Sequence, residues 1–550
     1  MAAPSNPRGP PVRKLSIACL AASAALSLLG CEGKSPRPAC PKGQTCLELG
    51  LDVEPATLDP HRANLVSEGW VIEDLMMGLT ANGPDASPVP GGATSWETSP
   101  DGLTWTFHLR RGAKWSDGQP VTADDYVFGL QRVLDPKVAS IYAYLAYVIK
   151  GAEPISEGKA AASSLGARAL DPYTLQLSLE HPAPYLLELT KHQSFYPAPR
   201  HAVERYGDGW VAPGRYVSNG PYKLVSWRLG DHIALAKNPQ FYDAAHVCVD
   251  RVDYFATPDS ISAERRVQRG ELDITNTFQS NRIDRLRRVM PAYVHSHTEL
   301  ATAYLSFNTR DVKPLQDLRV RRALSEGIDR GFMTAKLTRS GQLPAYAFVP
   351  PGTANYPQGP RTAWAEQPFA RRQVEAKALL AQAGYGPARP LKLEIKTSNN
   401  SESVLLAQSI QADWRSIGVA ASLVQNDGPV VFEAYANRDF QVGFMSWIAD
   451  FNDPMTFLGL LKSDTGAQNY GDYKNPAYDA LLEAADRQAD AGKRGAILAR
   501  AEQLMLDDEA LAPLYFNVTR ALVNPRVTGW VDNAENFHPT RWMCVRRSGR

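Results

Sequence analysis

The sequence predicts an α/β (mixed α+β) protein of several domains, and three observations support this prediction. First, 550 residues are enough for about three or four domains at roughly 150 residues per domain. Second, 44% hydrophobic, 21% charged and 9% aromatic residues are typical of globular proteins, and not of disordered chains or multi-span membrane proteins. Third, strand-like and helix-like hydrophobic patterns are mixed along the chain, which indicates sheets packed with helices.

The predicted elements follow in chain order from these patterns. Residues 103–110 alternate strictly between apolar and polar side chains, as in a half-buried strand, and turn residues follow them. Thr122 stands three residues before Asp125, which predicts a capping box at the start of a helix. Further strands are predicted over 175–179 and 391–395, and further helices over 374–383 and 478–488.

The N-terminus has the layout of an export signal. Arg8, Arg13 and Lys14 precede an apolar run over 15–29, which is shorter than the about 20 residues of a membrane-spanning helix. The run ends in Leu-Leu-Gly-Cys31, which resembles the bacterial lipobox, whose cysteine is acylated. We therefore predict a lipoprotein signal peptide over 1–30, lipid on Cys31 and a Pro/Gly/Lys-rich tether over 31–46. An ordinary signal peptide with a chance cysteine is the alternative.

This signal predicts the compartment and the state of the cysteines. The protein would be exported to the bacterial cell envelope, on its periplasmic or extracellular face, and held at the membrane by the lipid alone. The cysteines that remain are Cys40, Cys46, Cys248 and Cys544, which allow three pairings in an oxidising compartment. Proximity favours Cys40–Cys46 and leaves Cys248–Cys544, with free buried thiols as the alternative.

Charge and motifs exclude several classes of function. Residues 1–30 contain three basic residues and no acid, so the rest of the chain carries 56 Lys and Arg against 58 Asp and Glu, or −2. Such a balance does not favour nucleic-acid binding. The common hydrolase, nucleotide-binding and redox motifs are absent from the sequence. His295 and His297 would share a strand face, but solvent-facing histidines are commoner there than a metal pair. We therefore expect no enzyme activity, no cofactor and no metal.

Short motifs follow one another along most of the chain. In order, they are residues 54–60, 95–97, 101–110, 113–122, 219–224, 238–242, 307–308, 318–323 and 447–454. With these motifs in this order, the sequence resembles the peptide/nickel type of bacterial extracellular solute-binding proteins, family 5, over about residues 47–545. Within that family it is most similar to the oligopeptide-binding proteins of ABC transporters.

The resemblance implies a type II periplasmic-binding-protein-like fold, with two lobes, three domains and a ligand cleft between the lobes. Lobe 1 would consist of the discontinuous segments 47–76, 199–300 and 518–550, with an inserted domain over 77–198. Lobe 2 would span 301–517. The chain would cross between the lobes near 300 and near 517, and the two crossings would form a hinge.

Asp450 is the first candidate for a ligand contact. Residues 440–449 are almost continuously apolar, as in a strand covered on both faces, and Asp453-Pro454 is a typical start for a helix over 455–461. This start occupies Asp453 and leaves Asp450 at the end of a buried strand without a local partner, where a carboxylate is costly. In the resembled family the Asp of this Trp-x-x-Asp motif binds the α-ammonium of a peptide, which implies the same role for Asp450. A salt bridge to an internal arginine is the alternative.

Further contacts are implied by the same resemblance. A bound peptide needs partners for its backbone groups, and strand edges supply these without reading side chains. The matching backbone-contact residues are Asn64, Leu65 and Val66 on one side and Ser446, Trp447 and Ile448 on the other. The matching aromatic pocket residues are Tyr142 or Tyr144, and Tyr515 or Phe516. For any one of these aromatic side chains, core packing is an equally good explanation.

The sequence also departs from the family at specific positions. The Arg or His that binds a ligand carboxylate aligns with Phe444 and Ser403, and a pocket Trp aligns near Gly428. The family's inter-strand cysteine pair aligns with Ala301 and Ile448, so both partners are replaced together. The length of the ligand, and whether a ligand carboxylate is bound, therefore stay open.

We expect a lipid-anchored, monomeric substrate-binding component of an ABC importer. It would capture oligopeptides between two closing lobes and present them to the permease subunits with their ATPases. The rival within the same fold is a different solute, such as a nickel chelate, haem, an oligosaccharide or a modified peptide. A secreted hydrolase, or a sensor or surface chaperone, built on this scaffold would be a different class of function.

Overall fold

The computed structural model describes residues 40–356 and 359–546. The predicted signal peptide, the lipidation site Cys31 and most of the tether lie outside these residues. The described residues 43–356 and 359–546 belong to one compact unit. No helix in the described ranges is long and apolar enough to cross a membrane.

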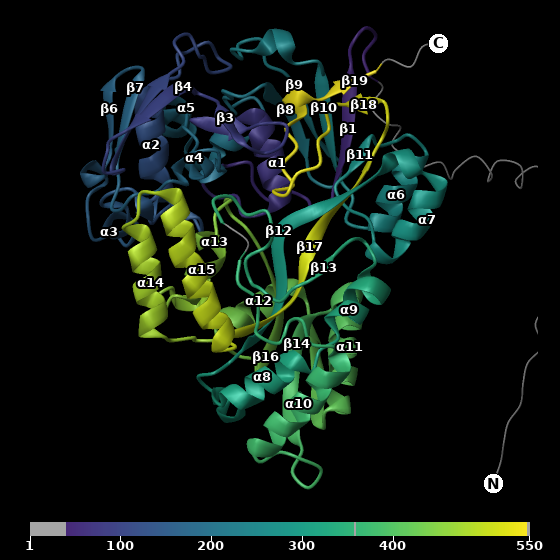
Figure 1. Ribbon diagram of the computed structural model, residues 1–550. Helices are drawn as coiled ribbons and strands as arrows, with labels where there is room; N and C mark the ends of the chain where they lie inside the picture. The colour runs from purple at the N-terminus through teal and green to yellow at the C-terminus, as the bar shows by residue number, and fades with distance from the viewer. Residues whose placement is uncertain (1–39, 357–358, 547–550) are drawn as a thin grey trace, which may run out of the picture. The chain divides into compact units, whose positions relative to one another are not determined.

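The described residues form a mixed sheet of eleven strands (Figure 1). Its strand order is β15 (Val419–Asn426), β14 (Leu391–Ser398), β16 (Val442–Ile448), β12 (Val294–Phe307), β17 (Leu511–Val523), β11 (Ile274–Thr275), β1 (Cys46–Leu51), β10 (Arg251–Ala256), β9 (His232–Lys237) and β8 (Tyr222–Arg228), with β13 (Leu343–Pro344) paired to β17. Strands that are distant in sequence are neighbours here, as β1 and β10 show by their parallel pairing.

Smaller sheets complete the β-structure of the described residues. A four-stranded sheet has the order β4 (Ala93–Thr98), β5 (Thr104–Leu109), β7 (Thr174–Ser178) and β6 (Ala167–Asp171), and the two-stranded sheets are β2 (Thr80–Asn82) with β3 (Pro88–Pro90) and β18 (Val527–Thr528) with β19 (Cys544–Val545). The strand predicted over 103–110 is β5. Its Trp105, Phe107 and Leu109 are buried, as the alternation predicted.

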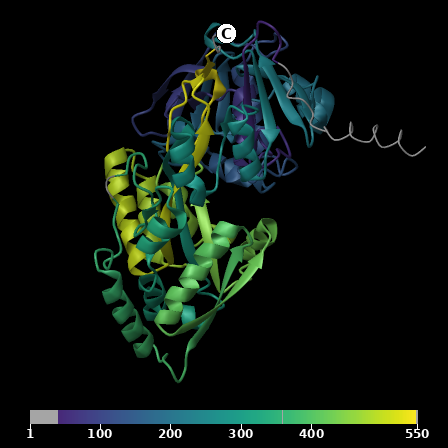
Figure 2. The same cartoon turned by 90° about the vertical axis from the view of Figure 1, so that its right-hand side faces the viewer.

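The α-helices cover the sheets on several sides (Figures 1 and 2). In chain order they are α1 (Val66–Leu75), α2 (Ala123–Val133), α3 (Ala152–Ser156), α4 (Leu186–Leu189), α5 (Arg200–Tyr206), α6 (Ser260–Gln268), α7 (Ile283–Val289), α8 (Leu318–Glu326), α9 (Arg330–Phe332), α10 (Phe369–Gln382), α11 (Ser401–Ser416), α12 (Gly428–Ala436), α13 (Met455–Leu458), α14 (Pro476–Asp486) and α15 (Ala491–Asp507). The predicted helices are α2, α10, α13 and α14. At the start of α2 the Thr122 N–H donates to Asp125 Oδ2 over 2.8 Å, which is part of the expected capping box.

Buried apolar side chains gather in separate cores. One core draws on residues 47–274 together with Phe451 and residues 521–543. Two others draw on residues 303–515 and 304–511. The C-terminal strand β17 therefore contributes to cores on both sides of residue 517, with Leu514 in one and Ala521 in another.

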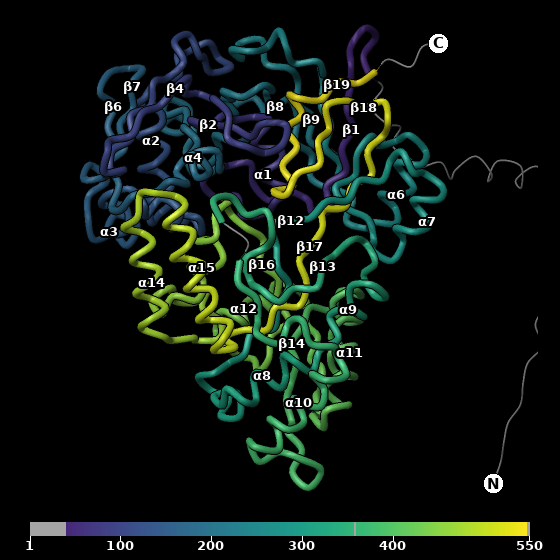
Figure 3. The backbone as a smooth tube through the Cα atoms, viewed as in Figure 1, coloured from purple at the N-terminus to yellow at the C-terminus, as the bar shows by residue number. Residues whose placement is uncertain are grey.

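β12 and β17 are the elements that link these cores. They pair antiparallel and run side by side from the strands around β1 to the strands around β16 (Figure 3). Residues 300 and 517, where the chain was expected to cross between lobes, lie on these two strands. The ladder is irregular here, because its register shifts between Thr298 and Thr302.

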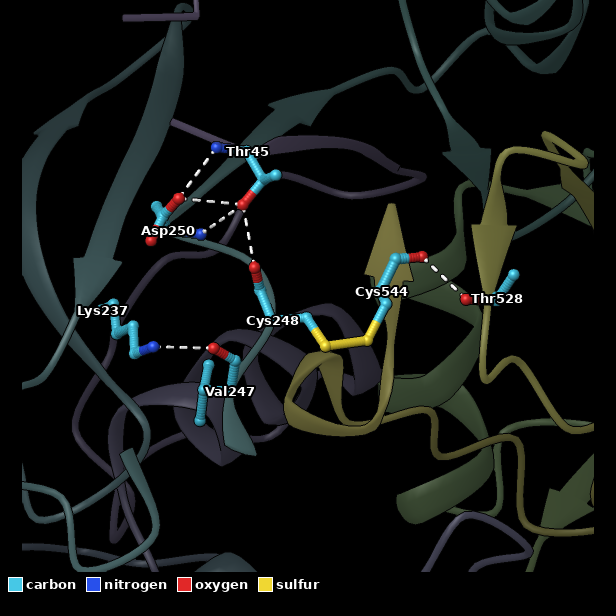
Figure 4. The surroundings of a disulfide bond; sticks show 7 residues. All are labelled: Thr45, Lys237, Val247, Cys248, Asp250, Thr528 and Cys544. Atoms are coloured by element: carbon cyan, nitrogen blue, oxygen red, sulfur yellow. Dashed lines mark hydrogen bonds between the residues drawn. A yellow bond between two sulfur atoms is a disulfide. The ribbon is translucent and has the colours of Figure 1, made fainter. Parts of the chain in front are cut away.

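A disulfide ties the middle of the chain to its end (Figure 4). Cys248 and Cys544 are bonded across a sequence separation of 296 residues, which is the long-range pairing that the sequence favoured. Hydrogen bonds flank the bridge: Thr45 Oγ1 donates to the Cys248 carbonyl over 2.8 Å, and Thr528 Oγ1 to the Cys544 carbonyl over 3.2 Å. Cys40 and Cys46 are also disulfide-bonded, and their pairing with each other stays a prediction.

Candidate functional site

The predicted ligand residues converge on one cavity of about 410 Å³, the central cavity. Its lining includes Asn64, Leu65, Val66, Tyr142, Tyr144, Ser446, Trp447, Ile448 and Asp450, together with Glu299, Phe432 and Tyr435. These residues come from segments that are far apart in the sequence. The cavity therefore exists only because the strands and loops of the folded chain bring them together.

Two further cavities adjoin the central one. The inner cavity, of about 260 Å³, shares Tyr144, Trp447 and Asp450 with it. The outer cavity, of about 510 Å³, shares Glu299 and Ser446 with it. We call the three cavities together the groove. Asp450 lies where the inner and central cavities meet, and Ser446 lies where the central and outer cavities meet.

Asp450 meets no basic partner in the part of the chain that the structure describes. Its carboxylate accepts a hydrogen bond from the Tyr144 hydroxyl, and its backbone N–H donates to Thr456 Oγ1 over 3.1 Å. Burial raises the pKa of Asp450 to about 6, while the Tyr144 hydrogen bond opposes that rise. A half-buried carboxylate with one neutral donor can accept a cation from outside the protein.

The neighbouring Asp453 has the internal arginine partner that was the competing explanation for Asp450. Its two carboxylate oxygens accept from Arg494 over 2.7 and 3.0 Å, and both side chains are buried. Asp453 Oδ1 also accepts the Met455 N–H over 2.9 Å at the start of α13. The internal salt bridge therefore forms at Asp453, as the structural role predicted for that residue requires, and leaves Asp450 available.

The strand that leads to Asp450 has one open edge. In β16, Ser446, Trp447 and Ile448 pair with β12 on one side. On the other side β14 pairs only with Val442 and Gly443 among the described residues. The Phe444 carbonyl accepts a hydrogen bond from the Tyr435 hydroxyl over 2.9 Å, and beyond it no described strand pairs with β16 on that edge, which is open to a ligand strand. The Trp447 indole N–H is buried without a hydrogen-bond acceptor in the described protein.

On the other side of the central cavity, residues 64–66 do not form the expected strand edge. Residues 64–66 lie at the start of α1, where Leu65 is the N-cap and Val66 is the first residue of the helix. The N–H groups of Asn64 and Leu65 donate to Glu68 Oε2 over 2.7 and 3.0 Å. The expectation of a strand edge at 64–66 is therefore wrong, because a helix start occupies these donors. The residues still line the central cavity.

The aromatic candidates separate clearly. Tyr142 and Tyr144 both line the central cavity, with ring centroids 6.4 Å apart. Tyr515 lines the outer cavity. Phe516, its neighbour on β17, lies on the other face of the strand in a buried cluster with Ala345 and Ala347. Between Tyr515 and Phe516, it is therefore Tyr515 that faces the groove.

Three positions where the sequence departs from the resembled family lie together at the outer cavity. Phe444, Ser403 and Gly428 all line the outer cavity. Ala301 and Ile448 face each other directly in the β12–β16 ladder, so a cysteine pair at these positions would be inter-strand.

Four charged residues of the groove were missed by the sequence analysis: Glu299, Glu402, Arg520 and Glu535. Glu299 lines the central and outer cavities, and Arg520 lines the outer cavity. Arg520 is the one charged residue within β17, and a charge inside an otherwise apolar strand was a signal that could have identified it. His295, the metal candidate, instead lies 3.1 Å from Asp532 through its Nδ1. His297 Nδ1 lies 2.8 Å from the Thr298 carbonyl oxygen.

Comparison with known proteins identifies the family. Residues 87–469 match the model of the bacterial extracellular solute-binding proteins, family 5 (middle region). The Escherichia coli periplasmic oligopeptide-binding protein OppA is 36% identical over 501 residues, which cover 90% of this chain and 91% of OppA. This chain belongs to the bacterial extracellular solute-binding proteins, family 5.

Other proteins similar to this family 5 member carry different names. The probable deoxycholate-binding periplasmic protein YgiS of Escherichia coli is 34% identical, with 90% of this chain and 92% of YgiS covered. The structure of the Escherichia coli murein tripeptide binding protein MppA has a TM-score of 0.83 at 34% identity and covers 92% of this chain and 99% of MppA. The structure of Burkholderia pseudomallei OppA has a TM-score of 0.82 at 34% identity and covers 92% of this chain and 100% of that protein.

These similarities confirm the fold predicted for the family 5 chain. It is a mixed α/β protein with the type II fold of periplasmic peptide-binding proteins. The family and its structural neighbours are substrate-binding proteins and not enzymes. Its curated relatives are periplasmic, which supports an exported, periplasmic location.

Proposed function

We propose that this protein is the substrate-binding component of an ABC importer and captures oligopeptides in the groove. The ammonium of the peptide's first residue binds Asp450, and the peptide backbone pairs with the open edge of β16. The observation that carries the proposal is the half-buried Asp450 carboxylate, which has a tyrosine hydroxyl and no basic group beside it in the described protein. Relatives whose names include oligopeptide and murein peptide binding support the choice of ligand.

Capture involves closure of two lobes around the peptide. Lobe 1 is 47–76, 199–300 and 518–550 with the inserted domain 77–198, and lobe 2 is 301–517. Two large apolar side chains that line the central cavity from different lobes are mostly exposed, Ile141 by 61% and Phe432 by 64%. Closure would bury both, and the ligand would favour it by binding the closed state more tightly. The hinge would lie at the irregular stretch of the β12–β17 ladder.

The remaining assignments concern the partners. The protein is a monomer held at the membrane by lipid on Cys31. The tether is shorter than the expected 31–46 and ends near residue 42, because Thr45 hydrogen-bonds to Asp250 and Cys46 begins β1. In the closed state it is recognised by the permease subunits, and their ATPases supply the energy. The protein itself carries out no covalent step.

The decisive experiment is Asp450→Ala, measured by calorimetry with tetra-alanine. Removing one partner of a buried charge pair costs roughly 3–5 kcal/mol, and about 1.4 kcal/mol is tenfold in affinity. We therefore expect binding to weaken by about a hundredfold or more while the protein stays folded. N-acetylated tetra-alanine should bind the unaltered protein equally poorly. Asp507→Asn, at the exposed end of α15, is the control that should leave affinity unchanged. An unaltered dissociation constant in Asp450→Ala would contradict the assignment.

A second candidate ligand class is favoured by one relative. YgiS is named as a probable deoxycholate-binding protein at 34% identity, so the fold can be associated with a ligand that has no ammonium group. Deoxycholate should therefore be titrated beside the peptides. Tight binding of deoxycholate that is insensitive to Asp450→Ala, with no peptide binding, would favour this class. Cleavage of a bound peptide, seen by mass spectrometry, would instead favour a hydrolase.

A further inference from the structure

Glu299 occupies an irregular position in β12. Thr298 pairs with Val518 and Thr302 pairs with Phe516, so the β12 ladder has extra residues between these two pairs. Such bulges turn side chains away from their regular direction. Leu300 within the bulge is tied to Ala534, whose carbonyl oxygen accepts the Leu300 N–H over 2.8 Å. Glu299 is therefore held at the boundary of the central and outer cavities, where it lines both.

The Glu299 carboxylate has no hydrogen-bond or ion-pair partner among the described residues. Burial raises its pKa to about 7, and the positive charge of Arg520 opposes that rise. Arg520 itself lies 3.5 Å from Glu402 and leaves its buried Nη1 without a hydrogen-bond acceptor in the described protein. Glu402 also accepts Ser280 Oγ over 2.9 Å. Glu299 is thus the less satisfied of the two glutamates around Arg520.

The groove as a whole is acidic. Its lining contains Asp450, Glu299, Glu402 and Glu535, and Arg520 is the one Lys or Arg among its described lining residues. Glu535 has a direct basic partner in Lys191, whose Nζ lies 2.7 and 2.8 Å from its two oxygens and which also pairs with Glu188 over 2.7 Å. Glu402 is near Arg520. Asp450 and Glu299 therefore remain as uncompensated carboxylates, and complementarity favours a ligand with two positive groups.

The spacing along β16 relates these two carboxylates to one ligand. A peptide that starts at Asp450 and runs along the open edge of β16 advances about 3.3 Å per residue. Its third or fourth residue would then pass Ser446, which shares both the central and the outer cavity with Glu299. A side chain at that point, and not the chain terminus, reaches Glu299. The positions that bind a terminal carboxylate in the resembled family hold Phe444 and Ser403 in the same outer cavity.

We propose that Glu299 forms a second cation-binding subsite, which takes the Lys or Arg side chain of a bound peptide downstream of the amino terminus held by Asp450. The proposal rests on the proposed function and adds a sequence preference to it. Arg520 pairs with Glu402 and makes the potential in the outer cavity less negative. It does not contact Glu299 directly.

The test is a positional scan of penta-alanine by calorimetry. Each of positions 2 to 5 is replaced in turn by Lys, by norleucine, which has the same chain length without charge, and by Glu. We expect Lys at position 3 or 4 to bind at least tenfold more tightly than norleucine at the same position, and Glu to bind more weakly than either. Glu299→Gln should abolish this preference for Lys over norleucine.

Two variants make the test specific to Glu299. Glu433→Gln removes an exposed carboxylate on α12 that lines none of the three cavities, and it should retain the preference for Lys. Glu299→Asp keeps the charge and should retain part of it. Equal binding of Lys and norleucine peptides at every position, or a preference that survives Glu299→Gln, would overturn the proposal and leave peptide capture intact. Failure of every peptide to bind the unaltered protein would overturn the proposed function, and the subsite with it.

Discussion

Asp450 and Asp453 lie three residues apart and meet different electrostatic surroundings. Asp453 is compensated by Arg494 in the core, whereas Asp450 is compensated by the Tyr144 hydroxyl alone among the described residues. In the free protein this difference leaves Asp450 partly protonated near neutral pH, because burial has raised its pKa to about 6. A ligand ammonium would reverse that effect by favouring the ionised form.

The affinity for peptide should therefore depend on pH with a known sign. Binding an ammonium requires both the ionised Asp450 carboxylate and a protonated peptide amine, whose pKa is about 8. Affinity should therefore be greatest near pH 7 and fall as the pH decreases through about 6. We expect about tenfold weaker binding of tetra-alanine at pH 5 than at pH 7, measured by calorimetry. Asp450→Asn should show no such step. A flat profile in the unaltered protein would contradict the assignment.

At the scale of elements, local patterns predicted the strands and helices well, because the formation of a strand or helix depends on side chains that are close in sequence. The alternation over 103–110 forms β5, and the capping box at Thr122 starts α2. The strand edge expected at 64–66 was wrong, because Glu68 of α1 accepts hydrogen bonds from the backbone N–H groups of Asn64 and Leu65. Which edge of β16 stays open depends on where β14 stops pairing, and no pattern within β16 indicates this.

The contact between α15 and the start of α13 allows a prediction about stability. Arg494→Met leaves Asp453 as an unpaired buried charge, so we expect the free energy of unfolding to fall by about 3–5 kcal/mol in urea denaturation. Arg487→Met on the same lobe is the matched control, since its side chain is 69% exposed and its ion pair with Glu483 is at 3.9 Å. Its effect should stay within about 0.5 kcal/mol. Equal effects of the two variants would argue against a stabilising role for the buried pair.

At the scale of the molecule, the cores are joined by the paired strands β12 and β17 and by the disulfide between Cys248 and Cys544. The bridge attaches the last strand, β19, to the segment that precedes β10. It therefore fixes the end of the chain after β17 has passed through both regions. Neither cysteine lines the groove.

Removing this bridge should lower stability without changing ligand affinity. For Cys248→Ser/Cys544→Ser we expect the free energy of unfolding to fall by about 2–5 kcal/mol, because the unfolded chain gains freedom over a long loop. Chemical denaturation measures the loss, and calorimetry with tetra-alanine measures the affinity. A denaturation midpoint equal to that of the unaltered protein would show that the bridge does not stabilise the fold.

The sequence alone determined the family, the fold class and most of the regular elements, and it indicated Asp450 as a candidate ligand residue, because motifs and periodicity are local features of the chain. The tertiary structure decided which groups meet. Tyr144 reaches Asp450 across 306 residues, and Arg494 reaches Asp453 across 41. The tertiary structure also placed Glu299 in the groove, because β12 has a bulge at this point where it pairs with β17 and, beyond it, with β16. Electrostatic partners are set by distance in space, and that distance follows from the packing of the whole chain.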